Sequence, residues 1–178
     1  LWRRIVKARE SARAPKIIVV DPRRTHTARN SDLHLQLRPG TNVALMNGLL
    51  QQLIAGNRVD TGYVSAHTRN FGELAAKVAS YTPEYVSGIT GVPADDIRKA
   101  AEWIGSSREV LSLFVQGVYQ SMGATDTVRL ICAMHLITGK IGRPGSAPFS
   151  ITGQTTAMSN REAGGSSALA GYRNYYND

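Results

Sequence analysis

Two apolar runs in the chain predict strands, and the first of them predicts a strand that is buried on both faces. The first covers Lys16–Val20 and is rich in β-branched residues, and the second covers Val110–Val115. Runs of this kind are typical of strands in parallel sheets, which helices cover on both sides. A shorter stretch, Leu33–Leu37, alternates between apolar and polar residues and predicts a half-exposed strand.

Helical periodicity fills most of the remaining chain. Leucines spaced three or four residues apart predict a helix over 43–55, with Thr41 or Asn42 as its N-cap and Gly56 in a left-handed C-cap. Residues 1–13 carry the same kind of spacing up to Pro15, which ends the helix.

A second long helix is predicted over 127–138, where Thr125 and Asp126 are suitable caps. Gly139 ends it, and Lys140 complements the negative end of the helix. Between 57 and 107 the pattern is one of short helices that begin at capping residues such as Asp60 and Thr82.

Helices that alternate with apolar strands predict an α/β fold. We expect a Rossmann-like, doubly wound and mostly parallel sheet with flanking helices. Residues 1–165 would form part of a dinucleotide-binding α/β domain of a larger enzyme, with a helical insertion over 57–107. A long loop rich in Gly, Pro, Ser and Thr ends this domain and is interpreted as facing the cofactor. Residues 166–178 are a polar tail and a candidate for disorder.

The charge balance favours an anionic partner. The 178 residues carry a formal net charge of +8, and basic residues cluster at Arg3–Arg4 and Arg23–Arg24 instead of forming one arm. This distribution indicates local contacts with anions. The single cysteine, Cys132, excludes an internal disulfide and a site made only of cysteines. Apolar runs stay well below the roughly 20 residues of a membrane span, so we expect no membrane insertion.

The common catalytic motifs are absent from the sequence. It contains neither GxSxG, a Walker loop, HExxH nor CxxC, and GxGxxG is also missing. His135 lies inside the helical pattern over 127–138 and has no neighbours at metal-ligand spacing. We therefore interpret it as a partly buried structural histidine and predict no metal ligand.

Polar residues follow the predicted strands and open the predicted helices at three places. In α/β proteins ligands bind beyond the carboxyl ends of the strands, and a helix N-terminus attracts anions. Arginines there form charge-assisted bonds to phosphate. The pattern favours a nucleotide-type site, with plain strand ends and helix caps as the alternative. The candidate residues are Asp21, Pro22, Arg23, Arg24, Thr25, Gly40, Thr41, Asn42, Gln116 and Gln120, followed in the loop by Gln154 and Arg161.

Three segments carry a resemblance to a known family. These are VVDPRRT, RPGTN and HLITGKIGRPG with PFSITGQ and NREAGG behind it. At these segments the sequence resembles the molybdopterin oxidoreductases, and within them the bacterial nitrate reductases of the assimilatory type. The resemblance runs from Leu1 to about Arg173. VVDPRRT and RPGT are shared with relatives such as formate dehydrogenases, whereas TGKIGRPG with PFSITGQ is specific to the nitrate reductase subgroup.

The resemblance implies a bis-molybdopterin guanine dinucleotide that holds one molybdenum atom. The runs Asp21–Thr25 and Gly40–Asn42 would contact one dinucleotide, and Gln116 and Gln120 would approach the cofactor near the metal. Gln154 and Arg161, with Gln116, would be the catalytic residues, since they line the pocket over molybdenum where a guanidinium attracts nitrate. Nitrate is the implied substrate, reduced to nitrite by oxygen-atom transfer.

The resemblance also implies partners that lie outside this chain. A 4Fe-4S cluster and the cysteine ligand of molybdenum belong to other parts of the family's chain, so we expect this segment to be inactive alone. It would act with the rest of its own chain and with an electron donor protein or reductase domain, in the cytoplasm. In this family the position of Asn42 is more often aspartate, whose two oxygens suit guanine better than one amide oxygen does.

Two other functions remain open at this point. The segment is also compatible with another molybdopterin oxidoreductase such as a formate dehydrogenase. A basic, non-enzymatic α/β binding module is the alternative from a different class. Because few aromatic residues are interleaved with the basic ones, we do not expect nucleic acid as a partner.

Overall fold

The structure, a computed structural model, describes residues 2–11 and 14–151. Its helices are α1 (Trp2–Ala8), α2 (His26–Arg29), α3 (Asn42–Ala55), α4 (Thr61–His67), α5 (Phe71–Val78), α6 (Pro83–Thr90), α7 (Ala94–Ser106), α8 (Gln116–Tyr119) and α9 (Ala124–Ile137). Its strands are β1 (Ile18–Val20), β2 (Leu33–Leu35), β3 (Leu111–Phe114) and β4 (Ala147–Ser150).

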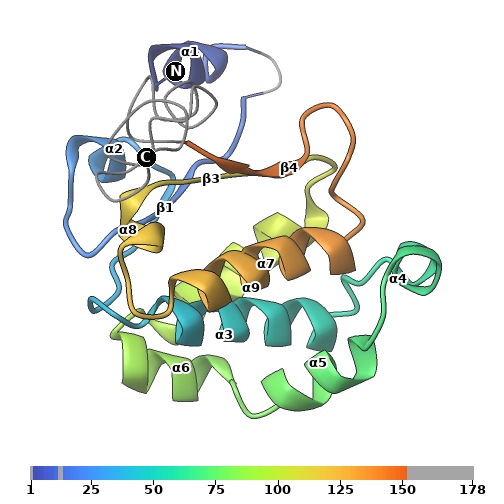
Figure 1. Ribbon diagram of the computed structural model, residues 1–178. Helices are drawn as coiled ribbons and strands as arrows, with labels where there is room; N and C mark the ends of the chain where they lie inside the picture. Colours follow the sequence, from blue (N-terminus) through green and yellow to red (C-terminus); the bar gives the residue numbers. More distant parts are fainter. Residues whose placement is uncertain (1, 12–13, 152–178) are drawn as a thin grey trace, which may run out of the picture.

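The strands form two parallel pairs. β1 pairs with β2, and Val20 lies opposite Leu35; β3 pairs with β4, and Leu113 lies opposite Phe149. Figure 1 shows α3, α7 and α9 as a helical layer beside the β3–β4 pair, with α5 and α6 on the far side of α3. The predicted α/β class with parallel strands and flanking helices is confirmed. β4 was missed, because its sequence contains Pro148 and lies in a segment that reads as a loop.

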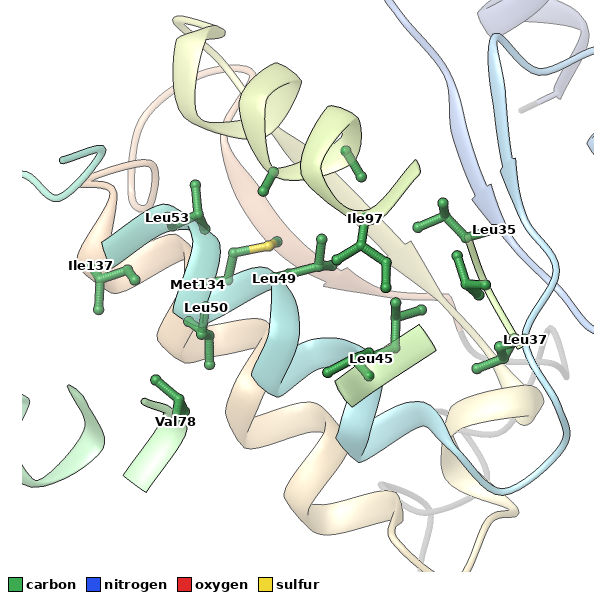
Figure 2. Packing of buried hydrophobic residues seen from close by; sticks show 14 of the residues in the cluster. Leu35, Leu37, Leu45, Leu49, Leu50, Leu53, Val78, Ile97, Met134 and Ile137 are labelled. Atoms are coloured by element: carbon green, nitrogen blue, oxygen red, sulfur yellow. The ribbon is translucent and has the colours of Figure 1, made fainter. Parts of the chain in front are cut away.

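Helix α3 lies at the centre of the core. Four of its leucines are buried, and Figure 2 shows them packed between Val78, Ile97, Met134 and Ile137 from the surrounding helices; they are Leu45, Leu49, Leu50 and Leu53. A helix that is apolar on most sides is typical of a buried position. Gly48 lets α6 approach closely, since a Cβ placed there would lie 2.9 Å from Val86 Cγ2.

The predicted helix boundaries hold in part. Asp60 and Thr82 cap α4 and α6 as expected, because their side chains accept from the backbone N–H groups of Tyr63 and Tyr85. The predicted left-handed C-cap at Gly56 is wrong. Gly56 has a φ of −84°, and the left-handed residue is Asn57, with a φ of 53°. Asparagine tolerates this conformation, so the turn forms one residue later.

Helix α9 begins earlier than predicted. It starts at Ala124 after Gly123, so neither Thr125 nor Asp126 serves as its N-cap. The end is as expected: Gly139 has a φ of +62°, and the backbone N–H of Lys140 donates to the carbonyl of His135. This is the left-handed ending for which glycine is favoured.

The β3–β4 pair is covered on one face by the described residues. Ser112 and Phe114 point towards the helices, whereas Leu111 and Leu113 are 52% and 36% exposed. Phe149 on β4 is exposed beside Leu113. The strand expected to be buried on both faces is β1, and this expectation is not met within residues 2–11 and 14–151, because Val20 is 47% exposed. Among the helices described, none has the length and apolarity needed to cross a membrane.

Gly48 provides a test of the α3–α6 contact. We expect Gly48→Ala to lower the free energy of unfolding by about 1–3 kcal/mol, because the added methyl group overlaps Val86. Alanine is the better helix former by about 1 kcal/mol, so a loose contact would give the opposite sign. Gly88→Ala in α6 is the matched control: nothing lies within 4 Å of a Cβ there, and we expect no loss. Urea denaturation of the chain measures both variants.

Candidate cofactor-binding site

The segment after β1 is a tight polar turn. The Asp21 carboxylate accepts a hydrogen bond from the backbone N–H of Arg23 (2.7 Å), and the Asp21 carbonyl accepts one from His34 Nε2 (2.9 Å). Thr25 caps α2, because its hydroxyl oxygen accepts from the N–H of Ala28 (3.3 Å). The side chains of Arg23 and Arg24 are exposed, and neither forms an ion pair with a described residue. The turn therefore presents two guanidinium groups to solvent at the carboxyl end of β1.

A groove of about 960 Å³ lies beside this turn. It begins at the carboxyl ends of β1 and β2 and continues to the junction between α6 and α7. The lining residues are Pro22, Arg23, His34, Gln36, Leu37, Arg38, Pro39, Thr90, Gly91, Pro93 and Asp96. Arg23 and Asp96 place opposite charges on its two sides. Ligands of α/β proteins bind in crevices at this end of parallel strands.

The turn from Arg38 to Asn42 leads into the N-terminus of α3. Gly40 adopts a φ of +84°, which few residues other than glycine reach. Thr41 occupies the N-cap position, but its hydroxyl donates to the carbonyl of Arg38 (2.6 Å) and does not cap the helix. The first N–H groups of α3 thus have no side-chain cap. Such groups, together with the helix dipole, attract anions.

Asn42 joins this turn to the end of β3. Its amide Nδ2 donates to the carbonyl of Gly117 (3.3 Å) in α8, the short helix that Gln116 opens and Gln120 follows. An aspartate at this position has no hydrogen to donate to that carbonyl, so the amide suits this contact. Both glutamine side chains are exposed on the same short segment.

The structure brings together part of the predicted set. The turn Gly40–Asn42 contacts Gly117, next to Gln116, through Asn42, and Pro22 and Arg23 line the groove. Asp21, Arg24, Thr25 and Gln120 do not line that groove. Gln154 and Arg161 lie outside the described residues, so their predicted positions remain predictions.

The sequence-based site missed five polar groove residues: His34, Gln36, Arg38, Thr90 and Asp96. The first three follow from β2 being parallel to β1, because its carboxyl end then lies at the same edge. Asp96 carried no such signal. It sits in the first turn of α7, where an acidic residue is expected for helix stability alone.

His135 and Lys140 form a buried pair of polar side chains behind β3. His135 is fully buried, with Nδ1 donating to the carbonyl of Lys140 (2.6 Å) and Nε2 accepting from the Ser112 hydroxyl (2.8 Å). It is the satisfied histidine that the sequence predicts. The ammonium of buried Lys140 donates to the carbonyls of Ile104 and Gly105. Lys140 thus complements the end of α7, and the prediction that it serves α9 is wrong.

No cluster of three or more potential metal ligands from His, Cys, Asp or Glu occurs in the described part of the chain.

Burial lowers the pKa of Lys140, and the neighbouring charges of Arg143 and Arg58 lower it further. Burial also lowers the pKa of His135, an effect that the hydrogen bond to Lys140 opposes and the charge of Lys140 reinforces. His135 therefore favours its neutral form in the folded chain.

Comparison with known proteins places this chain in a family. The sequence model of the molybdopterin oxidoreductases matches residues 3–174, and the chain belongs to this family. A nitrate reductase of Synechocystis sp. is 43% identical over 163 residues, which are 91% of this chain and 23% of that protein. The alpha subunit of F420-dependent formate dehydrogenase 1 of Methanococcus maripaludis is 38% identical over 156 residues, 88% of this chain and 23% of that protein.

A solved structure shows the same fold. Acetylene hydratase from Pelobacter acetylenicus matches with a TM-score of 0.72 and 31% identity, over 76% of this chain and 19% of that one. The chain thus spans about a quarter of the length of the curated relatives named above. The family implies a molybdenum–pterin cofactor and an oxidoreductase.

Stability at acidic pH tests the His135 assignment. Its folded pKa lies below the ordinary value of 6.5, so below that value the unfolded chain binds more protons and the free energy of unfolding falls. We expect the His135→Gln variant, which keeps a hydrogen-bond donor and an acceptor at this position, to lose this fall in the free energy of unfolding at acidic pH. Urea denaturation at about pH 7.5 and about pH 5.5 measures it. His67→Gln, at an exposed histidine, is the control, and an equal fall in all three proteins would contradict the assignment.

Proposed function

We propose that this chain is part of the catalytic subunit of a molybdenum nitrate reductase, in which it binds part of a bis-molybdopterin guanine dinucleotide. The observation that carries the proposal is the polar edge at the strand ends. There the groove with Arg23 lies after β1 and β2. The uncapped N-terminus of α3 contacts Gly117, the residue after Gln116, through Asn42. The family membership supports the pterin cofactor, and the geometry supports a dinucleotide at this edge.

The donor set fits such a group. Arg23 and Arg24 offer guanidinium hydrogens for pyrophosphate oxygens, as does the N-terminus of α3. Within the groove, Asp96 is the carboxylate that would accept N–H groups of the base. Asn42 donates its amide Nδ2 to Gly117 and offers one neutral amide oxygen as acceptor, so it is a weaker candidate for the base than a carboxylate.

The bound group would supply oxygen-atom transfer, in which two electrons and two protons convert nitrate into nitrite and water. The residues of this chain would hold the cofactor and keep it in position. Gln116, Gln154 and Arg161 would line the substrate pocket, with the Arg161 guanidinium attracting nitrate. Electrons would arrive through a 4Fe-4S cluster elsewhere in the parent chain, from a donor protein or reductase domain, in the cytoplasm.

The choice of nitrate rests on the loop segment. TGKIGRPG followed by PFSITGQ resembles the assimilatory nitrate reductases, and a nitrate reductase is 43% identical. A formate dehydrogenase is the second candidate, favoured by a relative with that name at 38% identity over nearly the same residues. Membership of an oxidoreductase family disfavours the non-enzymatic module.

Substrate assays on the parent protein separate the two candidates. We expect the full-length, molybdenum-loaded protein to oxidise a reduced dye when nitrate is added and to release nitrite. Formate should not reduce an oxidised dye at a comparable rate. The molybdenum content must be measured on the same sample. A loaded protein that oxidises formate and leaves nitrate unchanged would establish the second candidate instead.

Asp96 tests the base-binding part of the proposal. GDP is a suitable probe for the cofactor-free parent protein, and inosine diphosphate lacks one N–H donor of guanine. We expect Asp96→Asn to lower the affinity for GDP about tenfold, which corresponds to the loss of roughly one charge-assisted hydrogen bond. The difference in affinity between GDP and inosine diphosphate should also become smaller. Asp95→Asn is the matched control, because Asp95 pairs with Arg98 and does not line the groove. Calorimetric titration of the wild type and the two variants with both nucleotides measures the six affinities.

A further inference from the structure

Arg38 connects the turn before α3 to the end of α6. Its backbone N–H donates to the carbonyl of Thr90 (2.8 Å). Its side-chain Nη1 donates to the carbonyls of Gly88 (2.9 Å) and Ile89 (3.2 Å). One residue therefore makes three hydrogen bonds to the last turn of a helix about 50 positions further along the chain.

The last carbonyls of α6 suit a cation. The final four carbonyls of a helix have no partner within the helix and carry partial negative charge, so a guanidinium bonded to them is stabilised twice. Gly91 then ends α6 with a φ of +78°. A Cβ on Gly91 would lie 3.5 Å from Arg38 Nε, so the arginine side chain runs across this glycine.

The remaining bonds of the turn are mostly local. The backbone N–H and hydroxyl of Thr41 both donate to the carbonyl of Arg38 (3.3 and 2.6 Å). Apart from the contact between Asn42 and Gly117, the hydrogen bonds that tie residues 38–42 to distant parts of the described chain all involve Arg38. Gly40 faces open space, because nothing lies within 4 Å of the position that a Cβ would take there.

Helix α6 is itself held firmly. Val86 packs against Gly48 of α3 and is fully buried. Thr90 is also buried; its hydroxyl donates to the carbonyl of Val86 (2.8 Å) and accepts from the N–H of Val92 (3.1 Å). The end of α6 is thus a fixed support to which Arg38 attaches the turn.

We propose that Arg38 is a positioning residue: it fixes the turn at residues 38–42, and with it the N–H groups that open α3, against the end of α6. The inference rests on the proposed function, because those N–H groups are part of the proposed dinucleotide site. Arg38 then acts through the turn, with its Nη1 engaged by α6 and not by phosphate. It also gives the helical insertion a role, since α6 holds the turn from behind.

Hydrogen exchange and GDP titration of the full-length, cofactor-free protein test the inference. We expect Arg38→Gln to speed amide exchange at residues 40–44 about tenfold and to lower the affinity for GDP by a similar factor. This is the size of effect expected when charge-assisted hydrogen bonds are lost. Arg38→Lys should restore part of both, because an ammonium still reaches helix carbonyls. Arg98→Gln is the matched control: Arg98 also joins α7 to α6, through Glu84, but lies away from the turn. It should change neither quantity.

Each outcome decides a different point. Unchanged exchange at residues 40–44 in Arg38→Gln would overturn the positioning role, as would faster exchange with unchanged GDP affinity. A wild-type protein that does not bind GDP would overturn the proposed dinucleotide site, and the inference with it. If Arg38→Gln does not fold, the comparison of Arg38→Lys with Arg98→Lys takes its place, and equal values in those two would also overturn the role.

Discussion

The close packing of α3 is the constraint on which the rest of the described structure depends. Its leucines fill the space between α5, α6, α7 and α9, and Gly48 allows Val86 of α6 to approach its backbone. Interiors packed at this density leave little room for helices to shift independently. Apolar contacts therefore fix the body of α3 in space, and the turn before it is attached separately, through Arg38, to the end of α6.

At the polar edge the chain contributes backbone and charge. Turns after β1, before α3 and after β3 place guanidinium groups, uncapped N–H groups and amides around one end of the parallel strands. This is the expected division of labour in a cofactor enzyme, where the protein supplies orientation and electrostatics and the cofactor supplies the chemistry. It explains why the sequence carries none of the common catalytic motifs and still belongs to an oxidoreductase family.

The sequence predicted what local physical chemistry determines. Two apolar runs and one alternating stretch predicted three of the strands, and caps such as Asp60 and Thr82 predicted helix starts. Both kinds of signal depend on neighbouring residues. It failed where partners are distant in the sequence. β4 exists because Leu113 pairs with Phe149, and Asp96 enters the groove because α7 packs beside β2. The sequence pattern predicts that Lys140 complements the end of the preceding helix, α9. Its actual bond to Gly105 at the end of α7 spans 35 positions, so local pattern does not indicate it.

That Lys140 contact gives α7 a mechanical role. One end of the helix is bound by the Lys140 ammonium, at the start of the segment that leads to β4, and its other end carries Asp96 in the groove. A helix of 13 residues is about 20 Å long and stiff along its axis. α7 thus links two distant parts of the described chain, Lys140 before β4 and the groove that Asp96 lines, through one stiff element.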